Sequence, residues 1–100
     1  MTILPQELCL HQARLTAAGG EWMVAVDSVM QTEDKANLLV NVILEQPLDE
    51  EHFTSRKLGL AVPASVILDP ETCAEVIEQI QQWVDATEGD GFLDLVHHHN

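Results

Sequence analysis

The sequence predicts a small α+β domain in which an antiparallel sheet packs against one amphipathic helix. Two segments with alternating apolar residues, 21–30 and 37–45, are typical of a β-hairpin, here called hairpin 21–45. A third segment, 70–87, has apolar residues at helical spacing. The 100 residues, 46% of them hydrophobic, are enough for one domain with a modest core. We therefore expect the element order α-β-β-α-β-α.

The expected domain covers residues 1–88, and residues 89–100 form a C-terminal tail. Its first part, with apolar residues beyond a glycine break, is expected either to pack as a final short strand or to stay a flexible segment that acts as a linear binding motif. The packed strand is the favoured alternative.

The N-terminal residues 5–18 have the composition of a helix that would end at Gly19-Gly20. Their apolar residues form no clean stripe, however. A strand from Leu8 to Thr16 that turns at the same two glycines is therefore the alternative, and we favour the helix.

The hairpin strands are expected to bury one face each, formed by every second residue. These residues are Trp22, Val24, Val26 and Met30 in the first strand and Leu38, Val40, Val42 and Leu44 in the second. Polar residues such as Asp27 and Asn41 show that at least one face of the sheet is not wholly buried, which favours antiparallel pairing.

Residues 49–58 are predicted to form a short helix, because Asp49 suits the N-cap position and Gly59 suits the end. A strand within 60–68 follows, interrupted by Pro63. Because proline has no N–H to donate to a sheet, we expect an edge strand, or a short strand that begins after the proline.

The C-terminal helix 70–87 is the clearest element. Asp69 suits the N-cap and Pro70 the first helical position, and the cluster Gly89-Asp90-Gly91 would end the helix. One face is apolar and consists of Cys73, Val76, Ile77, Ile80, Trp83 and Val84. The opposite face is acidic and consists of Glu71, Glu75, Glu78 and Asp85.

The two cysteines, Cys9 and Cys73, are too few and too far apart in the sequence for a disulfide framework. Cys73 lies on the apolar helix face and is expected to be buried as a small hydrophobic residue. The role of Cys9 stays open.

The charge is the most informative feature for function. The chain has 17 acidic and four basic residues, a formal net charge of −13, and neither lysine nor arginine follows Lys57. Such a charge repels nucleic acids and anionic membranes, so neither is expected as a direct partner. It favours a protein partner with a basic surface, bound by the acidic helix face, by a strand edge, or by Phe92, Leu93 and Leu95 of the tail.

Two alternative functions are also considered. His97, His98 and His99 form a cluster of imidazoles that can bind nickel, copper or zinc, as in a metal-delivery or metal-sensing accessory protein. The carboxylates of the C-terminal helix can also imitate phosphates, as in a nucleic-acid mimic that blocks a DNA- or RNA-binding protein.

Catalysis finds no support in the sequence, which lacks GxSxG, HExxH and a glycine-rich phosphate loop. We therefore expect a non-catalytic intracellular adaptor, inhibitor or chaperone without a cofactor. The start lacks the pattern of a signal peptide, and no apolar run could span a membrane, so a cytoplasmic location is expected. The expected element order and the low pI are similar to those of small acidic secretion chaperones of bacteria. Whether the protein forms a homodimer stays open.

Overall fold

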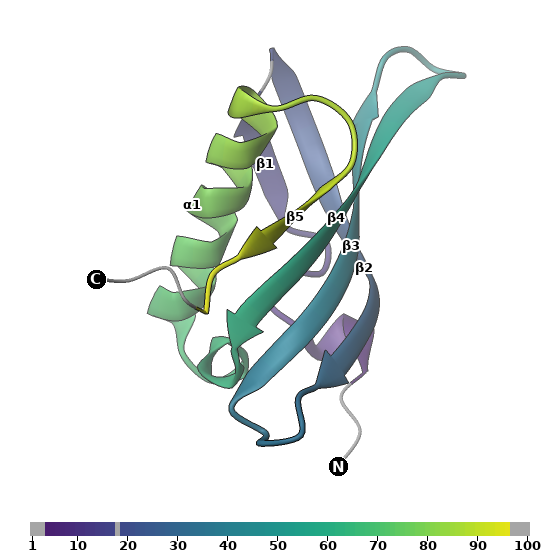
Figure 1. Cartoon of the computed structure of the whole chain (residues 1–100). Coiled ribbons are helices and arrows are strands. Elements are labelled where there is room, and N and C mark those ends of the chain that lie inside the picture. The colour runs from purple at the N-terminus through teal and green to yellow at the C-terminus, as the bar shows by residue number, and fades with distance from the viewer. Residues whose placement is uncertain (1–3, 18, 97–100) are drawn as a thin grey trace.

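The computed structural model describes residues 4–17 and 19–96, in which one curled sheet wraps around one helix (Figure 1). The strands are β1 (Arg14–Ala17), β2 (Gly20–Gln31), β3 (Asn37–Pro47), β4 (Phe53–Pro63) and β5 (Gly91–Asp94). They lie in the order β1-β2-β3-β4-β5. The first three neighbouring pairs are antiparallel, and β5 is parallel to β4. The sheet is therefore mixed, whereas a purely antiparallel sheet was expected.

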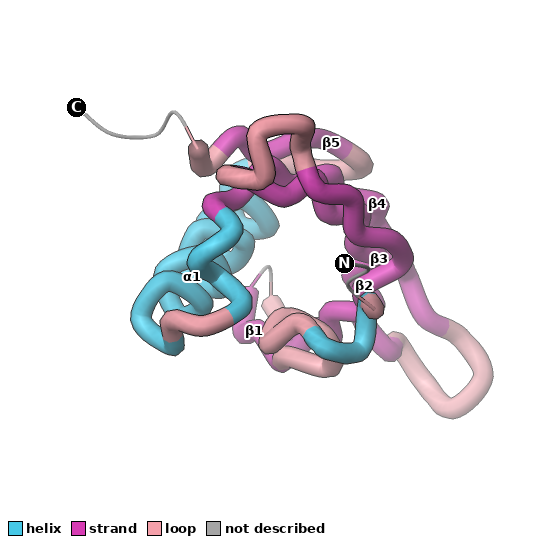
Figure 2. Tube along the Cα trace, turned by 90° about the horizontal axis from the view of Figure 1, so that it is seen from below, coloured by secondary structure: helices cyan, strands magenta, loops and turns pink. Residues whose placement is uncertain are grey.

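The helix α1 (Pro70–Ala86) lies across the open side of the curled sheet, between β1 and β5 (Figure 2). It closes the concave face, and the core lies between the two. The Gln81 side chain of α1 accepts a hydrogen bond from the Thr16 N–H of β1, at 3.3 Å. This contact partly protects the outer edge of β1, which would otherwise leave backbone groups unpaired.

The helix faces agree with the sequence prediction. Cys73, Val76, Ile80 and Val84 are buried, and Ile77 and Trp83 are partly buried against them. The hairpin strands β2 and β3 are also confirmed, and every inward residue predicted for the second strand is buried. The core of the protein thus consists of the residues that these two periodic patterns indicate.

The predicted order α-β-β-α-β-α is wrong, because the chain is rich in strands and its order is β-β-β-β-α-β, with two short 3₁₀ helices (Pro5–Glu7 and Ala64–Ile67). The similarity to secretion chaperones rested on that order and loses its basis. Residues 5–18 do not form the favoured helix: after the first 3₁₀ turn they lead into β1. The alternative strand that turns at the glycines is right in type, since Gly19 has a φ of +80° and begins the turn back into β2.

The helix predicted over residues 49–58 is also wrong. These residues form the β3–β4 turn and the first half of β4. The Asp49 carboxylate accepts hydrogen bonds from the backbone N–H groups of Glu51 and His52, at 2.8 and 2.9 Å. A side chain that bonds to N–H groups two and three residues ahead caps a helix in one context and closes a turn in the other, so the sequence signal is the same.

The strand predicted within 60–68 ends at Pro63, and residues after the proline form the second 3₁₀ helix. Its position is also corrected. Residues 58–61 of β4 pair with β3 on one side and with β5 on the other, so this part of β4 is an interior strand and offers no free edge. Pro63 is tolerated because it is the last residue of the strand.

A register shift in β2 corrects one more prediction. The pairing with β3 shifts between Val26 and Ser28, which adds one residue to β2. Met30 therefore points to the opposite face from Trp22 and Val24, and it is 66% exposed.

The two cysteines are joined. The Sγ atoms of Cys9 and Cys73 form a disulfide across 64 residues of sequence, which ties the N-terminal segment to the first turns of α1. Cys73 is buried, as predicted. The argument that the two cysteines are too far apart in the sequence for a disulfide framework does not hold for this pair, because the fold brings their Cα atoms to 6.5 Å. Among the described residues, no helix is long and apolar enough to cross a membrane.

Candidate protein-binding surfaces

The first turn of α1 is held by Asp69. Its carboxylate accepts hydrogen bonds from the Thr72 hydroxyl, at 2.8 Å, and from the Glu71 N–H, at 3.1 Å. These two bonds keep the pKa of Asp69 below its ordinary value, and the bond from the Thr72 hydroxyl has the larger effect. The cap orients the start of the helix and so places the acidic side chains that follow.

The last turn of α1 is held by Arg56 of β4. Its Nη1 donates to the carbonyl oxygens of Val84 and Thr87, at 3.3 and 2.8 Å. The guanidinium lies over the indole rings of Trp22 and Trp83, with its Cζ 5.1 and 5.8 Å from their centroids. A cation is favoured at a helix C-terminus and over an aromatic face, so Arg56 is a structural residue.

Glu71, Glu75 and Glu78, which we call the acidic row, are exposed along α1 as the sequence predicts. Asp85 is exposed about two turns beyond Glu78. Neither of the two ion pairs within the described part of the chain involves the row. The acidic row thus presents carboxylates to solvent without a neutralising partner.

A small hollow of about 160 Å³ lies beside the row. Glu75 and Glu78 form one side of it, and its other side includes the apolar residues Pro63 and Leu95. The structure therefore brings one residue of the tail, Leu95, next to the acidic row. An apolar wall next to carboxylates suits the stem and the charged end of a lysine or arginine side chain.

The other tail residues lie elsewhere. Leu93 points inward and packs partly buried against the core, as Leu95 does. Phe92 points outward from β5, is 59% exposed, and lies over Gly59 of β4. A Cβ atom at Gly59 would come within 2.8 Å of the Phe92 ring, so the glycine is what lets the ring lie flat against the sheet. The predicted site residues therefore do not form one surface.

Sequence reasoning missed the convex side of the sheet, which we call the outer face. It combines partly exposed apolar side chains with a few charged ones, and α1 lies on the opposite, concave side of the sheet (Figure 2). Its apolar residues are Met23, Ala25 and Met30 of β2, Leu39 and Ile43 of β3, and Phe92 of β5. The signal that could have found it is the second set of alternating residues in the two hairpin strands, several of which are apolar as well.

His97, His98 and His99 lie outside the described residues, so the metal-binding prediction is not tested. Residues 4–17 and 19–96 contain no group of three or more side chains that could hold a metal ion. Comparison of the chain with protein-family models, with curated proteins and with solved structures finds no match. The function must therefore be argued from the surfaces themselves.

Proposed function

We propose that this protein is a non-catalytic binding protein, an adaptor, inhibitor or chaperone, whose acidic row docks a partner with a basic surface. The observation that supports this proposal most is the set of three exposed carboxylates on one side of a well-capped helix. A rigid row of like charges attracts a complementary surface, raises the association rate and excludes acidic partners.

The positions of the basic residues strengthen the argument. Arg14 pairs with Glu21 at 3.6 Å on β1 and β2, and Arg56 is held at the C-terminal end of α1. Lys35 lies in the β2–β3 turn, and Lys57 is exposed on the outer face. None of the four basic residues therefore forms an ion pair with the acidic row.

The test changes Glu71, Glu75 and Glu78 to Gln together. We first identify the partner by crosslinking and affinity purification from the native cell, and then measure its association rate with each variant. The triple variant should associate at least about tenfold more slowly at low salt, and the difference should shrink as the Debye length falls from about 14 Å at 0.05 M to about 4 Å at 0.5 M. Its thermal stability should stay level or rise, since like charges are removed.

A matched control changes Glu33, Glu50 and Glu51 to Gln. These residues are exposed in the two hairpin turns, away from α1, and their substitution removes the same number of charges. The control should keep at least half of the wild-type rate. An equal loss in both variants would show that only the net charge matters and would refute a specific role of the row.

The cytoplasmic location remains a proposal from the sequence, and the disulfide makes it testable. Disulfides are rare in the cytosol and persist in oxidising compartments. Rapid alkylation of thiols in the native cell should modify both Cys9 and Cys73 if the protein is cytoplasmic. Protection of both residues would place it in an oxidising compartment.

A further inference from the structure

The outer face has the composition of a subunit interface. Met30 and Leu39 are direct neighbours across β2 and β3, at 66% and 40% exposure, and Ile43 lies two residues beyond Asn41 on the same strand. Side chains that alternate along neighbouring strands form one continuous surface. Monomeric proteins seldom leave a large contiguous apolar surface open to water.

The centre of this face is hollowed. A depression of about 590 Å³ has Asn41 and Gly59 in its floor and Phe92 as a wall. The Asn41 side chain donates one hydrogen bond to the Ser28 hydroxyl, at 2.9 Å. A second protein surface that fills the depression would therefore have to offer a donor to the remaining Asn41 carbonyl oxygen.

Three charged residues line the depression, and one of them, Asp90, accepts a hydrogen bond through its carboxylate from the Lys57 N–H, at 2.8 Å. The other two, Asp27 from β2 and Lys57 from β4, belong to no ion pair of the described residues. They lie on either side of β3, where Lys57 is in register with Ile43 and Asp27 belongs to the bulge next to Val42. Two strand spacings separate their backbones by about 10 Å, and their side chains form no ion pair with each other.

A two-fold axis parallel to β3 would give each of these two charges a partner in a second copy of the chain. Such an axis, lying against the outer face, turns a second copy so that its β2 lies over β4 of the first, and its β4 over β2. Asp27 of each copy then faces Lys57 of the other, which gives two ion pairs across the interface. This is the self-complementary arrangement that a closed dimer requires, and it matches the aligned packing of two sheets.

We propose that the protein forms a symmetric homodimer through the outer face, with its apolar residues on both sides of the depression along the strands and two Asp27–Lys57 pairs at the sides. Three strands of eleven residues measure roughly 14 by 37 Å, about 500 Å² in plan. Two such faces together would bury about 1,000 Å², which is the lower end for a specific interface.

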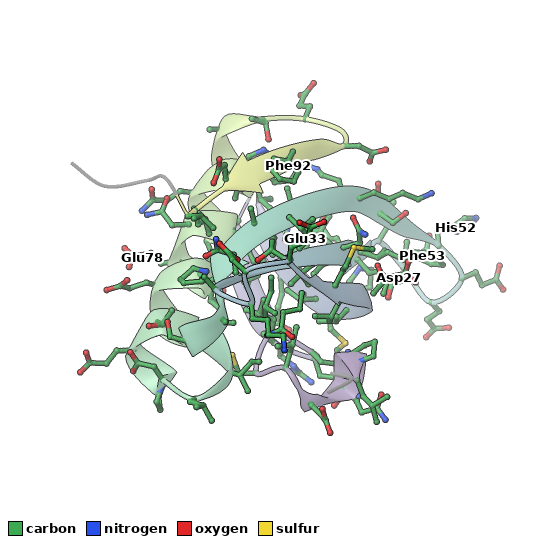
Figure 3. The ribbon with its side chains drawn as sticks, turned by 60° about the horizontal axis from the view of Figure 1, so that its bottom comes forward. Asp27, Glu33, His52, Phe53, Glu78 and Phe92 are labelled. Carbon is green, nitrogen blue, oxygen red and sulfur yellow. A yellow bond between two sulfur atoms is a disulfide. The ribbon has the colours of Figure 1, made fainter. Side chains whose placement is uncertain are left out.

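The net charge of −13 is compatible with this arrangement because the acidic row is on the far side. The helix α1 covers the concave face, and Figure 3 shows Glu78 on the side of the molecule away from Asp27 and Phe53. In the dimer the two acidic rows lie at opposite ends and repel each other least. Dimerisation does not depend on the proposed function of the row, although it would give the protein two copies of it.

The test uses the full chain and two charge reversals, Asp27→Lys and Lys57→Glu. Sedimentation equilibrium of the wild type should give a monomer–dimer equilibrium with a Kd below about 100 µM. Each single variant should dimerise at least about tenfold more weakly, because two ion pairs become two repulsive contacts. When the two variants are mixed, both contacts are complementary again, and a mixed dimer should form within about threefold of the wild-type Kd.

Glu33→Lys and Lys35→Glu serve as matched controls, since they reverse exposed charges in the β2–β3 turn. They should leave the Kd within about threefold of the wild-type value. Circular dichroism confirms that all variants fold. A wild type that stays monomeric at about 0.5 mM refutes the proposal. So do controls that weaken the dimer as much as the reversals, or a mixture that does not recover.

Discussion

Arg56 shows how one residue can hold two elements together. It lies on β4 and donates to the carbonyl of Thr87, just past the end of α1, while its guanidinium lies between two indoles. The Trp22 indole is itself fixed, because its Nε1 donates to the Ala17 carbonyl at 2.9 Å. A planar cation that stacks and donates at the same time is a property of arginine that lysine does not share.

We expect Arg56→Met to lower the free energy of unfolding by about 1–2 kcal/mol, because the variant keeps an apolar stem but loses the charge and both donors. The free energy of unfolding of Arg56→Lys should lie between those of the wild type and Arg56→Met. Urea unfolding measures the difference. Arg14→Met is the control, since Arg14 forms an exposed ion pair, 68% exposed, that contributes at most about 1 kcal/mol. Equal stability of the Arg56→Met variant and the wild type would contradict the structural role.

Asp69 and Asp49 are equivalent in local chemistry and belong to different elements. Each carboxylate accepts hydrogen bonds from the residues two and three positions ahead, and these bonds lower its pKa. Asp69 begins a 17-residue helix, whereas Asp49 closes the turn between two strands. The element that follows depends on whether an apolar stripe of period 3.6 or of period 2 comes next.

Asp69→Asn tests the charge of the helix cap. Because the folded-state pKa of Asp69 lies below the ordinary aspartate value of 3.8, the carboxylate contributes stability above that value and loses it as the pH falls through the lower, folded-state pKa. Asparagine also caps helices but has no charge. The variant should therefore be less stable than the wild type at pH 7 and equally stable at about pH 2. Urea unfolding across this range checks it, and a difference that persists at low pH contradicts it.

At the scale of the whole molecule, the disulfide joins the N-terminal segment to the helix that closes the sheet. Cys9 lies before β1, and Cys73 lies in α1, after four of the five strands. Leu8 and Leu10 flank Cys9 in the core, so the bond fastens a segment that is already packed. Its main effect is expected on the unfolded chain, where it closes a large loop.

Removal of the disulfide by Cys9→Ser with Cys73→Ser should lower the free energy of unfolding by about 4 kcal/mol, the chain-entropy value for a loop of this size. The fold itself should persist, because the core is otherwise unchanged. Dithiothreitol should destabilise the wild type by a similar amount and leave the double variant unaffected. A wild type that does not respond to the reductant would show that the bond contributes nothing to stability.

Local signals predicted α1, the hairpin strands and the acidic row, and all three are present. A helix depends on contacts between residues three and four apart, so its cap, its apolar stripe and its acidic face can all be read from 17 neighbouring residues. The inward residues of β3 are likewise set by simple alternation. These are the parts of the protein that the sequence by itself determined.

Long-range pairing decided the rest. Residues 14–17 and 53–58 became strands because partner strands were available on β2 and β3, and strand formation depends on such partners more than on intrinsic preference. The outer face, with Asp27 and Lys57 on opposite sides of β3, exists only once four strands and a bulge are in register. The Cys9–Cys73 bond needs two segments 64 residues apart to meet. Neither is visible in the sequence, because no local pattern states which distant residues will be neighbours.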